Sequence, residues 1–395
     1  MAGKPNVLII GAVKTHYWLV FGTWLDQRRP RDWGVTAHWA IKFLDLYPDG
    51  METRLQDAQV IANKDPKQQE HVLFHDGQTG ESIKTIPLGP ARRYSQRKIR
   101  QALVNGLEEV IQYHKALQEI RVLSDGVEVS FADGTSASGS IVVACDGSQS
   151  DTRQHLFEEK EDALWKPIPG FVLNNFWMQY TREQALEVKS QLSHFMDIAV
   201  HPNGTYYGLI PLDISDMDKP ETWKFQIFMA FASDLKPEED APEKRFELVK
   251  EAGKAFVNPF SLGIEYMPEG TYINPDRYGI WETKQWDHKG GRVILAGDAA
   301  HAMTAHRAQG LNHALQDVLN IVSGMKDVQN ERMRLEDFVK TYVDEVVERG
   351  SNEVRMSRAQ GMAVHNWGKS KDMPILKIGT TPLHMERSVV PLPSS

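Results

Sequence analysis

The sequence predicts an α/β fold in which a parallel sheet carries an inserted β-rich segment and a helical C-terminal segment. Three short apolar runs support this prediction, because runs of this kind are typical of strands buried on both faces of a parallel sheet. Each run ends in a turn of small or polar residues. The runs and their turns are Val7–Ile10 with Gly11, Ile141–Cys145 with Asp146–Gly147, and Val293–Ala296 with Gly297–Asp298.

The third turn is the strongest candidate for a binding site. After Gly297–Asp298 the chain passes through small residues and restarts as a helix after Gln309–Gly310. The first N–H groups of a helix lack acceptors within the helix, and the helix dipole is positive at that end. We therefore expect this turn to face an anionic or oxygen-rich ligand.

The first strand does not continue as a dinucleotide-binding motif does. Such a motif places two further glycines after the first, opens a helix, and supplies an acidic residue about 20 positions later. Here Ala12–His16 follow Gly11, and Tyr17–Leu25 is aromatic and strand-like. Only 18 residues, from Val13 to Pro30, precede the next block, whereas a complete strand–helix–strand unit needs roughly 30. The sequence predicts that the crossover helix is missing.

The remaining pattern divides the chain into expected parts. Arg31–Leu46 has helical spacing, a helix begins after Ser95 as N-cap, and two Asp-Gly pairs between residues 119 and 146 indicate hairpins. We expect a discontinuous cofactor domain over residues 1–160 and 286–330. We further expect a β-rich substrate domain over 161–285, C-terminal helices over 331–372 and a tail over 373–395.

Composition narrows the possible classes of function. The net charge of −8 disfavours nucleic acid as a partner, since phosphate contacts need clustered Lys and Arg. A single cysteine, Cys145, permits no internal disulfide and fits a reducing compartment. No apolar run is long enough to span a membrane. We expect a cytoplasmic enzyme or binding protein without a membrane span, of unknown oligomeric state.

Taken together, the blocks resemble the FAD-dependent aromatic hydroxylases, the group A flavin monooxygenases, and most closely the salicylate-hydroxylase-like fungal enzymes. The resemblance covers most of the chain and rests on the order and spacing of the blocks. They are Val7–Gly11, Arg31–Gly34, Tyr94–Arg100, Val142–Arg153, Gly297–His301, Gln309–Asn312 and Glu348–Gly350.

The resemblance implies a Rossmann-like FAD-binding domain and a reaction that hydroxylates or epoxidises an aromatic or polycyclic molecule with NAD(P)H and O2. Asp298 would bond the ribityl or ribose region, Gln96 the ribityl-phosphate region, and the backbone of Gly310, Leu311 and Asn312 the flavin ring. Asp146, Gly147 and Arg153 match a block associated with both FAD and NAD(P)H. The other cofactor-binding candidates are Gly11, Arg31, Gly34, Arg97, Gly297 and Gln309.

The chain also departs from this family. The glycine-rich helix is absent, Ala302 and Ala305 replace usual prolines, and Ala308 stands where glycine is common. Two alternatives therefore stay open. Beside the main expectation of an FAD-dependent monooxygenase, one is a flavin-free relative that acts as a binding protein or non-redox isomerase or cyclase. The other is a defective gene model with a mis-spliced exon over residues 13–30.

No protein nucleophile is evident, and a metal site is a weaker interpretation. His301, His306 and His313 with Asp298 are spaced unlike a common pair of ligands on one helix face. Of these histidines, His306 is the weak candidate for a catalytic group facing the substrate, against a structural or solvent-facing role.

Overall fold

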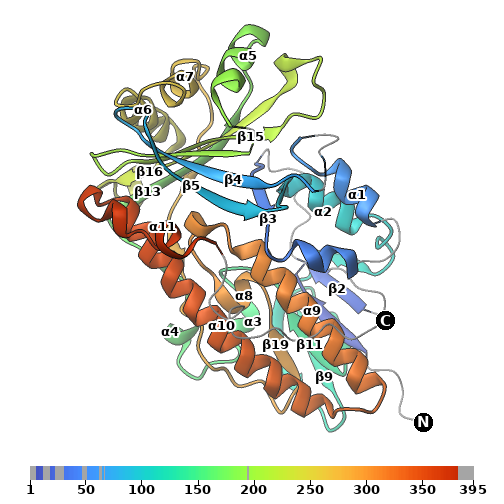
Figure 1. The fold of residues 1–395 in the computed structure, drawn as a ribbon. Coiled ribbons are helices and arrows are strands. Elements are labelled where there is room, and N and C mark those ends of the chain that lie inside the picture. Colours follow the sequence, from blue (N-terminus) through green and yellow to red (C-terminus); the bar gives the residue numbers. More distant parts are fainter. Residues whose placement is uncertain are drawn as a thin grey trace.

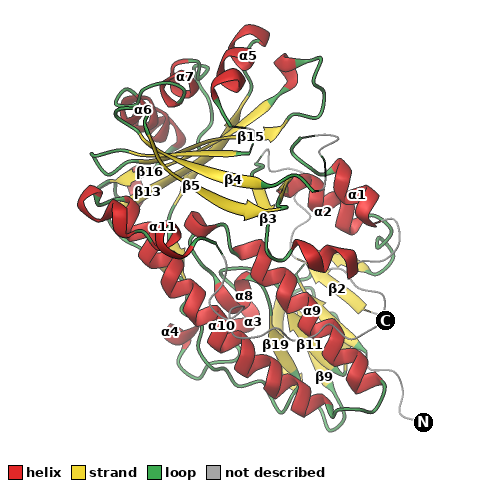
Figure 2. Ribbon diagram, in the orientation of Figure 1, coloured by secondary structure: helices red, strands yellow, loops and turns green. Residues whose placement is uncertain are grey.

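The computed structural model describes residues 6–11, 18–22, 31–46, 51–61, 65, 67–193 and 195–380. Its two main sheets lie one above the other in Figure 1, with the connecting helices α1 (Met51–Asp57) and α2 (Gln96–Val104) at one side. Figure 2 shows the lower sheet covered by long helices and the upper sheet carrying short helices on its outer side.

The lower sheet is parallel throughout and contains the three predicted apolar strands. From edge to edge it runs β19 (Val293–Leu295), β11 (Ile141–Ala144), β1 (Val7–Ile10), β2 (Trp18–Gly22) and β7 (Ile111–Tyr113). The first three strands are buried along their whole length, as expected for strands covered on both faces. The α/β class predicted from the sequence is confirmed.

The expected loss of a crossover helix falls on residues 12–17 and 23–30, which lie outside the described residues. The flanking strands are described: β1 and β2 pair in parallel, and seven residues, 11–17, separate them in the sequence. A parallel crossover that contains a helix usually needs a dozen or more residues.

The hairpins indicated by the Asp-Gly pairs are confirmed. β8 (Leu117–Val122), β9 (Val127–Phe131) and β10 (Ser136–Gly139) form an antiparallel sheet with turns at Asp125–Gly126 and Asp133–Gly134. One residue, Ser140, separates β10 from β11, and the two strands belong to different sheets.

The upper sheet has seven strands, mostly antiparallel. Their order is β17 (Pro275–Asp276), β13 (Phe171–Met178), β16 (Lys224–Ala232), β15 (Tyr206–Asp213), β14 (Met196–Val200), β4 (Glu70–Asp76) and β5 (Ser82–Gly89). Strand β4 pairs in parallel with β14. The sheet therefore combines residues 161–285 with a hairpin from the part of the chain that we expected in the cofactor domain. Its apolar face packs under α5 (Arg182–Gln191), α6 (Pro242–Gly253) and α7 (Phe260–Glu265).

The prediction of a helix over Arg31–Leu46 is wrong. Residues Gly34–Ala37 form β3, which pairs antiparallel with β6 (Arg92–Ser95), and only Ile41–Leu46 is helical, as the 3-10 helix η1. Side-chain acceptors hold the extended backbone: Gln226 accepts from the Gly34 N–H at 2.8 Å, and Asn312 from the His38 N–H at 2.9 Å. Tertiary hydrogen bonds thus override the apolar spacing.

The long helices α9 (Gly310–Gln329) and α10 (Leu335–Val364) follow the sequence prediction and pack side by side across the lower sheet. Short elements complete the chain: α3 (Asp151–Gln154), α4 (Lys160–Ala163), β12 (Lys166–Pro167), β18 (Gly279–Ile280), α8 (Asp298–His301), η4 (Ala305–Arg307), η5 (Trp367–Asp372) and α11 (Pro374–Ile378). Among the described helices, none combines the length and apolar character needed to cross a bilayer.

Candidate functional site

The turns after β1, β11 and β19 meet at one edge of the lower sheet, because neighbouring parallel strands end at the same edge. Gly11 has a φ of +99°, and a Cβ there would lie 2.2 Å from the Cys145 carbonyl oxygen. Gly297 has a φ of +60°. Only glycine adopts such turns without strain, and the absence of a side chain at Gly11 also lets the turn after β1 approach the backbone at the end of β11.

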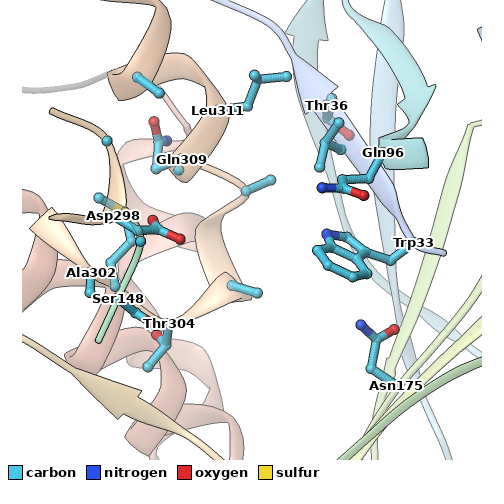
Figure 3. Close-up of a pocket in the computed structure, with 18 of the residues that line it drawn as sticks. Trp33, Thr36, Gln96, Ser148, Asn175, Asp298, Ala302, Thr304, Gln309 and Leu311 are labelled. Carbon is cyan, nitrogen blue, oxygen red and sulfur yellow. The ribbon is translucent and has the colours of Figure 1, made fainter. Parts of the chain in front are cut away.

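A cavity of about 1030 Å³ lies between this edge and the upper sheet. Its volume is at the upper end of the range for small-molecule sites. Figure 3 shows its two walls: Asp298, Ala302, Thr304 and Gln309 on one side, and Trp33, Gln96 and Asn175 on the other.

The first wall ends at the uncapped N-terminus of α9. The side chain of the N-cap residue, Gln309, makes no capping bond, and a Cβ on Gly310 would meet no atom within 4 Å. Gly310 and Leu311 line the cavity. Their N–H groups precede the first intrahelical bond, so donors and the positive end of the dipole are available to a ligand.

Asp298 points into the cavity without a partner. No described residue donates a hydrogen bond to its carboxylate, and the side chain is exposed to the open cavity. The surrounding protein raises the pKa of this carboxyl by desolvation, although His301 and Arg153 oppose the rise. The carboxylate is therefore an available acceptor for a ligand that donates hydrogen bonds.

A buried ion pair holds the Gly297 turn from behind. Asp317 on α9 accepts from the Gly297 N–H at 2.7 Å and pairs with His301 at 2.7 Å and with Arg349 of α10 at 2.5 Å. All three side chains are buried. Burial alone would raise the pKa of Asp317, but His301 and Arg349 hold it below its usual value.

Arg153 has a bracing role instead of facing the cavity. Its guanidinium donates to the carbonyl oxygens of Ser148, Ala163 and Ala299 at 2.5–2.9 Å and stacks on Trp281. The side chain is buried and lies outside the cavity lining. Arg153 thus ties the turn after β11 to α8, and the expected side-chain contact with a cofactor is replaced by a structural one.

Two further candidates also turn away from the cavity. The Asn312 amide is used by Thr36, His38, Ala40 and Ala308, and the exposed Arg97 lies outside the lining. Gln309 lines the cavity, but its amide is held by Trp39 and by the Thr380 carbonyl oxygen. The other candidates line the cavity as expected: Gly11, Arg31, Gly34, Gln96, Asp146, Gly147, Gly297, Asp298, Gly310 and Leu311.

The opposite wall near β3 is aromatic and cationic. The Trp33 ring stands in the cavity, and the Arg31 guanidinium lies 5.1 Å from its centroid. Arg31 also forms an ion pair with Asp276 of the upper sheet. Gly34 permits a close approach, since a Cβ there would lie 2.2 Å from the Arg93 guanidinium.

The upper sheet supplies a mostly apolar wall with a few polar groups. Ile198, Ile210 and Phe228 line it beside Asn175 and Gln226. The Tyr206 hydroxyl has no hydrogen-bond partner among the described residues, and burial raises the pKa of Tyr206. This wall fits a flat apolar ligand that carries oxygen substituents.

His306 lies where the two walls meet. Its Nε2 is 2.9 Å from the Tyr278 hydroxyl, and its ring packs against Tyr206 and Phe228. Burial, aided by His365, lowers the pKa of His306 to about 3. The ring is therefore neutral near pH 7, and it orients Tyr278 beside the cavity.

The three histidines of the metal interpretation are used separately. His301 pairs with Asp317, His306 with Tyr278, and His313 with Arg349. Within the described ranges, no group of three or more His, Cys, Asp or Glu side chains is arranged to hold a metal ion.

Sequence reasoning missed several cavity residues. Trp33 falls within the residues predicted as a helix, and Arg93 is absent from the candidate residues. Arg93 is in fact buried and bonds Gln226 at 2.6 Å, and burial lowers its pKa to about 10. The segment Arg92–Ser95 shows no polar–apolar alternation, and its burial pattern has no local signal in the sequence.

The comparisons with known proteins agree with this geometry. A family model described as "FAD binding domain" matches residues 264–357. A FAD-dependent monooxygenase of Emericella nidulans, dbaB, is 31% identical over 306 residues, which are 74% of this chain and 76% of that protein. Another, phnB of Penicillium herquei, is 28% identical over 90% of this chain and 87% of that protein.

Solved structures have the same fold at low identity. HpxO of Klebsiella pneumoniae, complexed with FAD and uric acid, has a TM-score of 0.73 at 16% identity and covers 94% of this chain and 92% of its own. The 2,6-dihydroxypyridine-3-hydroxylase of Arthrobacter nicotinovorans has a TM-score of 0.72 at 15% identity, covering 92% and 93%. The resemblance drawn from the sequence blocks is confirmed: this chain belongs to the FAD-dependent monooxygenases.

Proposed function

We propose that the chain is an enzyme that inserts one oxygen atom of O2 into an aromatic or polycyclic small molecule, with NAD(P)H as the electron donor. The observation that carries the proposal is the unpartnered Asp298 carboxylate, which faces a large cavity opposite an apolar wall. Relatives named FAD-dependent monooxygenases and salicylate hydroxylase support the reaction class and the aromatic substrate.

The residues of the first wall fit FAD. Asp298 is an acceptor suited to the hydroxyl groups of a ribityl chain, and the uncapped N–H groups of Gly310 and Leu311 are donors suited to the carbonyl-rich edge of a flavin. Gly147, where a Cβ would meet no atom within 4 Å, leaves room along the turn after β11. These donors and acceptors have no other partner among the described residues.

When bound, FAD supplies the redox chemistry that passes electrons from NAD(P)H to oxygen. The protein's own part is to orient the substrate and to exclude water. The wall of Ile198, Ile210 and Phe228 would hold the flat face of the substrate. The hydroxyl groups of Tyr206 and Tyr278 would form hydrogen bonds with the oxygen substituents of the substrate. His306, whose ring is neutral near pH 7, holds the Tyr278 hydroxyl in position for this contact.

The test is the absorption spectrum of the purified protein with and without added FAD. We expect a bound flavin spectrum, and NAD(P)H oxidation that increases when phenolic or polycyclic aromatic compounds are added. Product analysis by mass spectrometry in 18O2 should show one labelled oxygen atom per product.

The flavin-free alternative makes the opposite prediction. A colourless protein that takes up no FAD at tens of micromolar would contradict the proposal and favour a binding protein or a non-redox isomerase. A flavin-loaded protein that oxidises NAD(P)H without forming product would support the cofactor and reject the proposed substrate class.

A further inference from the structure

FAD carries an anionic diphosphate, and this chain lacks the feature that usually binds it. In dinucleotide-binding folds a glycine-rich turn and the following helix N-terminus supply the donors. Here seven residues separate the parallel strands β1 and β2, and one of them, Gly11, is a glycine. The sequence thus lacks the glycine pattern of that motif, and the described residues of the cavity lining include other donors.

Among the described residues, six Lys and Arg side chains line the cavity, and five of them already have a partner. Arg31 pairs with Asp276, Arg93 with Gln226, Arg277 with Asp240, Arg307 with Glu353, and Lys115 with Asp133. The sixth, Arg100, has no hydrogen bond or ion pair with any described residue. It is the cation in this lining that a bound anion can recruit at no cost to an existing pair.

Arg100 stands at the correct side of helix α2. It lies one turn after Gln96, and residues four apart share a helix face. The Gln96 amide also has no partner among the described residues and points into the cavity. Gly11 and Tyr113, at the carboxyl ends of β1 and β7, line the same cavity as Arg100.

The acidic groups at this end do not neutralise Arg100. Asp146 is satisfied within its own turn, where it accepts from the Ser150 hydroxyl at 2.6 Å and from the Thr152 N–H at 2.9 Å. Asp151, on α3, also lines the cavity but forms no ion pair with Arg100. An anionic group placed between α2 and the Gly11 turn would thus meet an available guanidinium.

We propose that Arg100 binds the diphosphate of FAD and, with Gln96, replaces the missing glycine-rich helix. The inference rests on the proposed function, since it presumes that FAD occupies the cavity. A guanidinium suits this role because its planar fork can donate two parallel hydrogen bonds to phosphate oxygens.

The experiment compares Arg100→Gln with Arg97→Gln. Both arginines lie on α2 and both are exposed, but Arg97 lies outside the cavity lining. FAD is titrated into each flavin-stripped protein and its fluorescence followed. We expect Arg100→Gln to raise the Kd for FAD by about tenfold to a hundredfold, the usual effect of losing a charged hydrogen bond. Arg97→Gln should leave this Kd unchanged, and Arg100→Lys should restore part of the affinity.

Two further measurements separate a charge effect from a structural one. The Kd for riboflavin, which has no phosphate, and the unfolding temperature without flavin should be the same for Arg100→Gln and the unsubstituted protein. Added NaCl should weaken FAD binding more in the unsubstituted protein than in Arg100→Gln, because salt screens the lost charge interaction.

Two results would overturn the assignment of Arg100: an unchanged Kd for FAD in Arg100→Gln, or a weaker Kd that comes with a lower unfolding temperature and an unaltered salt dependence. In both cases the unsubstituted protein still binds FAD, so the proposed function stands. If the unsubstituted protein binds no FAD, the proposed function fails and this inference fails with it.

Discussion

The Asp298 carboxylate is positioned to bind a ligand, and it lowers the stability of the flavin-free protein. It is exposed to the cavity and has no donor among the described residues, and desolvation by the surrounding protein raises its pKa. A raised pKa means that the flavin-free fold disfavours the charged form of this carboxyl. A ligand that supplies hydroxyl donors would form hydrogen bonds with this carboxylate.

Asp298→Asn should therefore move FAD affinity and stability in opposite directions. We expect the Kd for FAD to rise about tenfold or more, because hydrogen bonds to a charged acceptor are lost. The unfolding temperature of the flavin-free protein should rise, because a carboxylate whose charged form the fold disfavours is removed. Flavin fluorescence titration and thermal unfolding measure the two effects.

Asp317→Asn is the matched control for this prediction. Asp317 is fully buried and paired with Gly297, His301 and Arg349, whereas Asp298 is exposed to the cavity. Its substitution should lower the unfolding temperature of the flavin-free protein. A lower unfolding temperature for Asp298→Asn as well would show that the Asp298 carboxylate has a structural partner and is not reserved for a ligand.

At the residue scale, the sequence identified the turns but not the direction of every side chain. Gly297, Asp298 and Gly310 could be predicted because their spacing fixes a strand, a turn and a helix start. Arg153 and Asn312 belong to the same motifs, yet their side chains bond the backbone behind the cavity. A motif records which residue types are present, and both a cofactor and a neighbouring loop can use the same guanidinium or amide.

At the scale of elements, α9 and α10 are joined by buried charges. Arg349 on α10 bonds Asp317 at 2.5 Å, Glu345 at 2.6 Å and His313 at 2.9 Å. Through Asp317 this pair also holds the Gly297 N–H. The packing of the two long helices is thus connected directly to the turn that presents Asp298.

Arg349→Met should show how much this connection contributes. Removing one member of a buried ion pair typically costs about 3–5 kcal/mol, because the other charge stays buried. We expect a loss of this size in the free energy of urea unfolding. Adding Asp317→Asn to Arg349→Met should cost less than Asp317→Asn costs alone, and strictly additive losses would contradict the coupling.

The same scale shows where sequence patterns fail. The Ser95 N-cap predicted α2, and Ser95 indeed accepts from the Lys98 N–H at 3.1 Å. Residues 31–46 were wrongly predicted as helix because the strand β3 depends on Gln226 and Asn312, which lie about 190 and 280 positions later. Likewise, no local signal pairs β4 with β14 across more than 100 residues.

At the scale of the whole molecule, the cavity exists because the chain crosses between its two sheets. The lower sheet contributes turns rich in glycine and backbone donors, whereas the upper sheet contributes apolar and aromatic side chains. The first set suits a polar cofactor and the second a flat substrate. The loop from Ala302 to Gln309, which includes His306, lies where the two sets meet.

Enclosing histidines at this junction makes stability depend on pH. Burial lowers the pKa of His306 to about 3 and, despite a bond to the Ala308 carbonyl oxygen, that of His38 to about 4, from an ordinary value of 6.5. Between these values and 6.5 the unfolded chain binds protons that the folded chain does not. Each histidine therefore contributes stability above pH 6.5 that is lost as the pH falls toward its folded pKa.

His306→Asn should remove one part of this dependence. The lowered pKa of His306 implies that the buried ring reduces the free energy of unfolding by about 2 kcal/mol when the pH falls from 7.5 to 5. The destabilisation caused by the substitution should therefore be smaller at pH 5 than at pH 7.5 by about that amount, in urea unfolding without added flavin. His38→Gln should change in the same direction. Equal destabilisation at both pH values would mean that His306 titrates normally in the folded protein, and Tyr278 would then lose its neutral partner at mildly acidic pH.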